Sequence, residues 1–103
     1  MRNIYEYELP ELDSEVFTTE LAHKNVEIKT IISNTLLTPQ TFVQECDEWV
    51  IVLQGCAKIE MDGVVHKLKK GDTLFIPANK EHKLLKTKKV VVWLAVYIFD
   101  FSR

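Results

Sequence analysis

Short strands separated by turn signals place the strongest constraint on how this chain can fold. From Val26 onward the side chains alternate with a period of two, and Val26 and Ile28 share one face of a strand. Glu27 and Lys29 share the opposite face. Asp62-Gly63, between two alternating runs, is the strongest short-range signal for a β-hairpin. Such signals recur about every 8–12 residues and predict about seven or eight short strands, which is typical of a β-sandwich or a small barrel.

Two apolar runs predict strands in the interior of the protein. Trp49 to Leu53 is apolar at every position, as expected for a strand buried on both faces. Val90 to Phe99 is an apolar run of ten residues, whereas a helix that crosses a bilayer needs about 20. We therefore expect two buried strands and no association with a membrane.

The N-terminal part of the chain predicts a strand and a helix. Asn3 to Leu9 has the alternation of an edge strand. Residues 14–23 predict one short helix, because Ser14 can cap its first turn. Phe17 and Leu21 are four positions apart and would share one face of that helix. We expect the helix to lie against the sheet.

Composition and charge favour one compact domain that associates with itself. A chain of 103 residues with 47% apolar side chains can bury a single core, with residues 1–25 packed on a barrel of residues 26–103. Residues 1–50 hold ten acidic and three basic side chains, and residues 51–103 hold five acidic and ten basic ones. This uneven charge favours folding and self-association. The apolar run from Val90 to Phe99 leaves surface to cover, so we expect a homodimer.

The cysteines and the N-terminus predict a cytoplasmic location. Cys46 and Cys56 are too few for a disulfide framework. The N-terminus has no basic segment followed by an apolar one, as a secretory leader would have. We therefore expect both thiols to be reduced.

Two segments with fixed spacing carry the candidate site. The first, Glu48 to Gly55, is a carboxylate, six residues and a glycine, and Asp62-Gly63 follows it. The second, Gly71 to His82, has five residues between its glycine and Pro77, and its histidine comes five positions after Pro77. Together they resemble the two conserved motifs of the cupin superfamily, and the resemblance extends over roughly residues 26–98. It implies an all-β double-stranded β-helix, the cupin jelly-roll barrel, here with one short N-terminal helix.

The resemblance also implies a site at the inner end of the barrel. In metal-binding cupins a carboxylate and an imidazole share a divalent ion, and the matching residues here are Glu48 and His82. The His-x-His pair that usually precedes the carboxylate is absent, and Gln44 is a weak oxygen donor in that region. A zinc, iron, manganese or nickel ion is therefore expected to be weakly held or absent.

Further side chains are candidates for the pocket wall. Cys46 is close in sequence to Glu48 and would favour zinc if it faced inward, although a lone cysteine is more often an apolar filler. The aromatic residues could wall a ligand pocket, or could belong to the core or a dimer face. The predicted pocket residues are Phe42, Cys46, Trp49, Phe75 and Trp93.

Three functions remain open from the sequence. The first is a small cytoplasmic cupin that binds a divalent ion or a small polar metabolite at Gln44, Glu48 and His82. If it is an enzyme, the resemblance implies isomerase, dioxygenase or lyase chemistry. The second is a metal-free, non-catalytic ligand-binding or sensing module that acts as a homodimer, and the third is a structural partner domain. The lysine-rich run from Lys80 to Lys89 lacks arginine and aromatic residues, so we expect no binding of nucleic acid.

Overall fold

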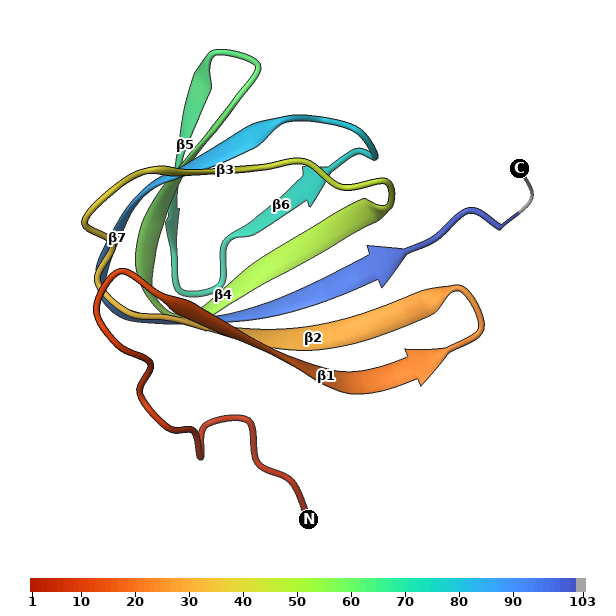
Figure 1. The fold of residues 1–103 in the computed structure, drawn as a ribbon, viewed down its shortest axis with the longest axis horizontal. Coiled ribbons are helices and arrows are strands. Elements are labelled where there is room, and N and C mark those ends of the chain that lie inside the picture. Colours follow the sequence, from red (N-terminus) through yellow and green to blue (C-terminus); the bar gives the residue numbers. More distant parts are fainter. Residues whose placement is uncertain (102–103) are drawn as a thin grey trace.

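The computed structural model describes residues 1–101, which form an all-β fold with no helix among them (Figure 1). Nothing in this range is a helix that could cross a membrane. All the strand pairs are antiparallel. The strands are β1 (Glu15–His23), β2 (Val26–Ser33), β3 (Gln40–Phe42), β4 (Asp47–Met61), β5 (Val64–Lys69), β6 (Thr73–Ile76) and β7 (His82–Ile98).

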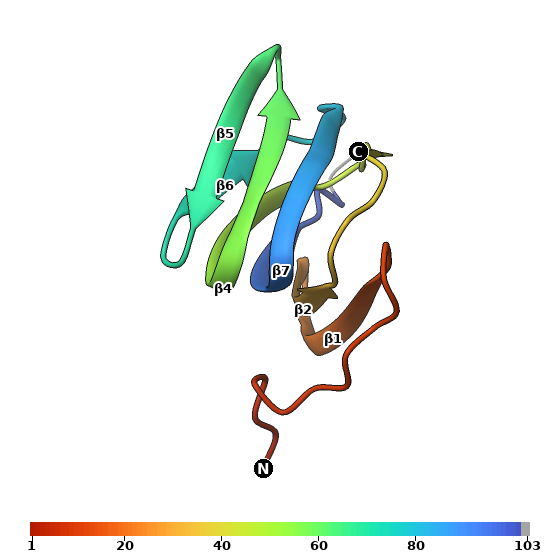
Figure 2. The ribbon, with the colours of Figure 1, turned by 90° about the vertical axis from the view of Figure 1, so that its left-hand side faces the viewer.

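The described strands form one curved sheet (Figure 1). Its order is β1-β2-β7-β4-β5, with β3 added on β7 and β6 added on β4. β4 and β7 are 15 and 17 residues long, and each pairs with different neighbours along its length. As a result β1 and β2 lie along one side of the molecule and β3, β5 and β6 along the other (Figures 1 and 2). The expected all-β class is confirmed among the described residues.

Alternation along each strand decides which side chains reach the core. In β4, Glu48, Val50 and Val52 are buried. Trp49 lies between them and is 37% exposed, so the expectation that this strand is buried on both faces is wrong. The apolar run in β7 is confirmed as a largely buried strand, and its fully or almost fully buried residues are Val91, Val92, Trp93, Ala95 and Tyr97.

The short helix predicted for residues 14–23 is wrong, because this segment is strand β1. It pairs with β2 along its length, from Glu15 opposite Ser33 to His23 opposite Val26. The two apolar residues that were expected to form the helix face are about half exposed, so a helix would gain no buried stripe here. Three β-branched residues, Val16, Thr18 and Thr19, also favour a strand over a helix.

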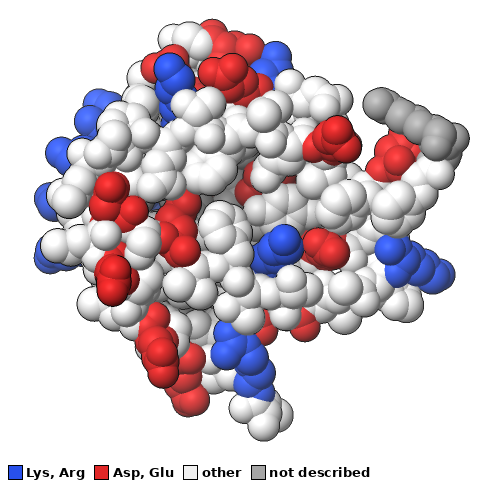
Figure 3. Space-filling view, in the orientation of Figure 1, with Lys and Arg blue, Asp and Glu red and all other residues white. Residues whose placement is uncertain are grey.

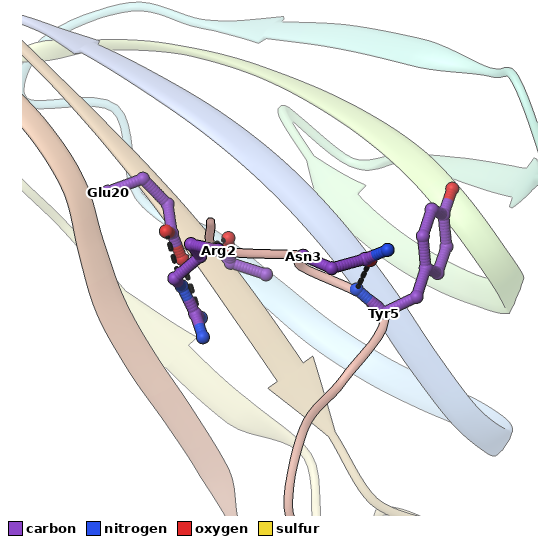
Figure 4. A network of polar contacts seen from close by, with 5 residues as sticks. Arg2, Asn3, Tyr5 and Glu20 are labelled. Atoms are coloured by element: carbon purple, nitrogen blue, oxygen red, sulfur yellow. Dashed lines mark hydrogen bonds and ion pairs between the residues drawn. The ribbon is translucent and has the colours of Figure 1, made fainter.

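The first residues of the chain do not form the predicted edge strand. Residues 3–9 contain no strand, and side chains at Arg2 and Tyr7 tie this part of the chain to the sheet. The guanidinium of Arg2 donates to both carboxylate oxygens of Glu20 on β1, at 2.6 and 2.8 Å (Figure 4). The Tyr7 hydroxyl accepts a hydrogen bond from Gln54 Nε2 at 3.3 Å. Side chains rather than a backbone ladder hold this segment in place.

The predicted turns are confirmed by the backbone. Asp62 and Gly63 have φ angles of 53° and 75°, as the two central residues of a tight hairpin turn between β4 and β5 require. Asn79, in the turn that follows Pro77, also has a positive φ, of 63°. Asparagine tolerates this left-handed conformation better than most residues do.

Gly55→Ala should destabilise the protein more than Gly63→Ala does. Both glycines have a positive φ, but a Cβ at Gly55 would lie 2.5 Å from the carbonyl oxygen of Val90, whereas one at Gly63 meets nothing within 4 Å. We expect the free energy of unfolding, measured with urea, to fall by about 1 kcal/mol for Gly63→Ala. For Gly55→Ala we expect a fall of at least about 3 kcal/mol. Equal losses would mean that the close approach of β4 and β7 does not require this glycine.

Candidate functional site

The candidate site is a small cavity inside the barrel with a volume of about 50 Å³. Most of its wall is apolar, and its polar groups come from Glu15, Gln44, Glu48, His82 and Tyr97. Acidic side chains lie around and within a hollow on the face of the molecule seen in Figure 3. The apolar part of the wall comprises Phe17, Ile31, Phe42, Val50, Ile59, Ile76, Leu84 and Trp93.

Glu48 is a buried carboxyl group with two hydrogen-bond donors around it. Its position on β4 is opposite Tyr97 on β7 and Ile76 on β6, and its side chain is 6% exposed. Gln44 Nε2 donates a hydrogen bond to Glu48 Oε1, and Tyr97 also bonds to the carboxyl group. Burial raises the pKa of Glu48, although the hydrogen bond from Gln44 and the nearby His82 oppose this shift.

His82 is held so that one ring nitrogen remains available to the cavity. It is the first residue of β7, opposite Phe42 on β3, and the two rings stack with centroids 5.8 Å apart. Nδ1 lies 3.2 Å from the carbonyl oxygen of Lys80. Since a carbonyl only accepts, Nδ1 carries the proton in the neutral ring and Nε2 is an acceptor. Nε2 has no hydrogen-bond partner in residues 1–101, and the ring is only 7% exposed.

Glu15 is a second, half-buried acid in the same cavity, and sequence reasoning missed it. Ser33 Oγ donates to Glu15 Oε2, and Trp93 Nε1 donates to Ser33 Oγ at 3.0 Å. Burial raises the pKa of Glu15 and the charge of Glu48 raises it further, while the bond from Ser33 opposes the shift. The helix predicted over this segment hid the residue. The missed signal was Lys24-Asn25, which forms the two-residue turn between β1 and β2.

The structure separates the other predicted site residues into three groups. Phe42 and Trp93 line the cavity as predicted. Cys46 belongs to the buried core instead, and burial raises the pKa of its thiol. Trp49 and Phe75 face outward, with 37% and 50% of their surface exposed, because they alternate with the inward residues of their strands.

The donor set does not fit a tightly held divalent ion. In residues 1–101 no three histidine, cysteine, aspartate or glutamate side chains are grouped so that they could hold one. Gln44 directs its amide nitrogen, not its oxygen, at Glu48, so it does not add a third metal ligand to Glu48 and His82. Catalytic zinc sites keep about three good protein ligands, whereas Glu48 and His82 supply two. The predicted metal-binding group is therefore absent from these residues as they are arranged.

The sequence of this chain belongs to the cupin family. The family model of the cupin domain matches residues 39–97, which is more than half of the chain and includes Gln44, Glu48 and His82. Glu15 lies outside this matched region, on the strand that precedes it. A search of curated proteins finds no match.

Solved structures of cupin proteins resemble this one closely. A Ralstonia eutropha protein named as a candidate mannose-6-phosphate isomerase is 32% identical, with a TM-score of 0.84, and the alignment covers 97% of this chain and 98% of that one. A cupin superfamily protein of Desulfitobacterium hafniense is 20% identical, with a TM-score of 0.75 over 94% and 87% of the two chains. The cupin domain of Schizosaccharomyces pombe Cnp3 is 11% identical, with a TM-score of 0.80 over 95% and 72%. The last two support the fold alone.

Glu15→Gln should stabilise the protein at neutral pH. The pKa of Glu15 is higher in the folded protein than in the unfolded chain. Between those two values the folded state binds more protons, so stability falls as the pH rises through this window. We expect Glu15→Gln to raise Tm by about 4 °C at about pH 7.5, with the difference shrinking towards pH 4.

Glu20→Gln, on the same strand, is the matched control with the opposite sign. The hydrogen bond from Arg2 lowers the pKa of Glu20, so its ionised form favours the folded state and the variant should melt lower at neutral pH. A lower Tm for Glu15→Gln at about pH 7.5 would contradict the assignment of Glu15 as an acid whose ionised form destabilises the folded state.

Proposed function

We propose that this cupin binds a small molecule rich in hydrogen-bond donors in its barrel cavity, without a metal ion. The observation that carries the proposal is the set of acceptors on the cavity wall, namely His82 Nε2 and the carboxyl groups of Glu15 and Glu48. The donors nearby, Gln44 and Tyr97, are already engaged with Glu48. A ligand that enters therefore meets unused acceptors, which suit ammonium, amidinium or hydroxyl groups.

The size and walls of the cavity support a ligand group of few atoms. A volume of about 50 Å³ accommodates a charged or polar head, and drug-sized ligands need pockets of about 300 Å³ or more. Aromatic faces from Phe42 and Trp93 would contact the apolar part of such a head or attract a cation. Ionised Glu15 and Glu48 would each be neutralised by a cationic head, which relieves the unfavourable burial of two like charges.

The similarity to the Ralstonia protein suggests a sugar phosphate as one ligand to test. Its name refers to isomerisation of mannose 6-phosphate. Interconversion of an aldose and a ketose moves a proton between neighbouring carbon atoms, and the acceptor His82 Nε2 near the acid Glu48 is a pair of the right chemical type. Sugar hydroxyl groups would reach the acceptors, while the rest of the molecule would extend outside the cavity.

Small donor-rich probes should bind the metal-free protein. Trp49→Phe leaves Trp93 as the sole tryptophan, so its indole N–H gives a single NMR signal next to Ser33 and Glu15. After EDTA treatment we expect methylammonium, guanidinium or mannose 6-phosphate to shift this signal saturably. Glu15→Gln or His82→Gln should weaken the binding at least about five-fold, which corresponds to about 1 kcal/mol.

Glu60→Gln, on the outer face, is the control and should bind like the parent. Formamide tests whether a neutral amide binds, and acetate tests whether an anion binds. Saturable binding of acetate alone, or binding of any probe only after zinc, iron, manganese or nickel is added, would contradict the proposal.

The outer face of the sheet supports a second proposal, that two copies of this chain form a homodimer. Five apolar residues are direct cross-strand neighbours in one row over β1, β2, β7, β4 and β6. Three of them are large and between 37% and 50% exposed. A row of this kind can pack against its own copy about a two-fold axis. The row consists of Leu21, Ile28, Val96, Trp49 and Phe75.

Trp49→Lys should convert the dimer to a monomer. The substitution places a charge at the middle of the row, where dimerisation would have to desolvate it. Light scattering after size exclusion at about 50 μM should give twice the chain mass for the parent and one chain mass for the variant. Val64→Lys, at the hairpin between β4 and β5, is the control and should leave the mass unchanged. A monomeric parent would refute the dimer.

A further inference from the structure

Five lysines from three strands form a patch on the outer face of the sheet, and none of them lines the cavity. Lys58 on β4 is directly opposite Lys67 on β5 and Lys86 on β7. In the neighbouring row, Cys56 on β4 lies between two further lysines of the same strands. We call these residues the lysine patch: Lys58, Lys67, Lys69, Lys86 and Lys88.

The sequence did not reveal this patch, because its lysines come from separate segments. Only two of the five belong to the lysine-rich run that ends at Lys89, and the pairing of β4 with β5 and β7 adds the rest. Figure 2 shows β5, β4 and β7 side by side on this face of the molecule. In Figure 3 the same region is the left-hand edge, where Lys and Arg side chains project.

The lysine patch carries positive charge that the protein itself does not neutralise. The ion pairs of residues 1–101 are Arg2 with Glu20, Lys29 with Glu27 and Lys80 with Asp62, so none includes a patch lysine. Like charges directly opposite each other on neighbouring strands destabilise a sheet. An anion that binds between the lysines would reduce this repulsion.

A groove with a volume of about 440 Å³ runs between the lysines. Its lining includes all five patch lysines and the small residues Cys56 and Ala57. The one acidic residue in the lining, Asp72, accepts a hydrogen bond from the backbone N–H of Lys69 at 2.8 Å. The groove therefore offers ammonium groups around a concave floor, with its only carboxylate turned to the main chain.

The extent of the patch favours a compact anion over a long polymer. Neighbouring strands are about 4.8 Å apart and residues two apart along a strand about 6.7 Å, so the five positions cover roughly 10 by 7 Å. On one side the patch ends at the next row, where Glu60 is opposite Lys83. The lining contains no arginine and no aromatic side chain on which a base could stack. The ammonium group of a lysine acts as a point charge and binds phosphate oxygens well.

We propose that the lysine patch binds a small polyphosphate anion, with two or three phosphate groups spanning the two rows of lysines. This site is separate from the barrel cavity, and it does not depend on the function proposed for Glu48 and His82. The ligand class is the linear phosphoanhydride, whether free or as the phosphate end of a nucleotide. Inorganic tripolyphosphate is the probe for the shared chemistry, and ATP and AMP distinguish the two sources.

Thermal melting of the full chain tests the proposal. In about 150 mM NaCl with EDTA, about 5 mM tripolyphosphate should raise Tm by at least about 4 °C, and sulfate at equal ionic strength by less than about 1 °C. Lys58→Gln, at the centre of the patch, should weaken tripolyphosphate binding about five-fold or more in calorimetry. Lys83→Gln makes the same charge change opposite Glu60 and should bind as the parent does.

A charge-reversing variant separates loss of binding from loss of folding. Lys58→Glu places a carboxylate between Lys67 and Lys86, so it should melt higher than the parent without ligand and no longer respond to tripolyphosphate. Glu48→Gln should leave tripolyphosphate binding unchanged, which distinguishes this site from the cavity.

Four outcomes would overturn the proposal. The first is an equal response to sulfate, and the second is an equal loss of binding in Lys58→Gln and Lys83→Gln. The third is saturable binding of a single-stranded RNA or of phosphatidylserine vesicles at concentrations where tripolyphosphate does not bind. The vesicles are included because Val64 and Val65 are exposed at the adjoining hairpin and could contact a lipid surface. The fourth is the absence of any change with tripolyphosphate.

Discussion

The pairing of β4 with β7 is the constraint on which the rest of this structure depends. The two longest strands are paired from Asp47 opposite Ile98 to Met61 opposite His82. Because side chains alternate between faces, this one register decides the position of both candidate sites. It places Glu48 opposite Tyr97 inside the barrel, and it places Lys58 opposite Lys86 outside it. A shift by one residue would exchange the two faces and remove both sites.

The interior of the barrel is organised around acids that are costly to ionise. Glu48 is surrounded by donors and Glu15 is held by Ser33, and burial is the main cause of the raised pKa of both. Burial of Tyr97, together with the Glu48 charge, raises the pKa of that hydroxyl as well, so it remains a hydrogen-bond donor. Among residues 1–101, Glu48 and His82 are not grouped with a third metal-ligating side chain, although the chain has the cupin fold.

The sequence predicted the strands and turns of the central region well, because those signals are local. The hairpin at Asp62-Gly63 is set by the two residues themselves. The N-terminal segment was predicted wrongly because Phe17 and Leu21, four apart, fit a helix, whereas pairing with β2 decides the outcome. Glu48 and His82 could be named from their motif spacing. Glu15 and the lysine patch could not, since both depend on strand pairing between distant segments.

Strand β1 joins the edge of the sheet to the interior of the barrel. Among the described strands it pairs with β2 alone, so it can detach by local unfolding without breaking any other strand pair. Yet it carries Glu15, whose carboxyl group is connected through Ser33 to Trp93. Detachment of β1 would therefore open the cavity and remove one of its acids in a single step. By thermodynamic linkage, any molecule that contacts Glu15 slows hydrogen exchange along β1, and fraying of this edge weakens the molecule's affinity in turn.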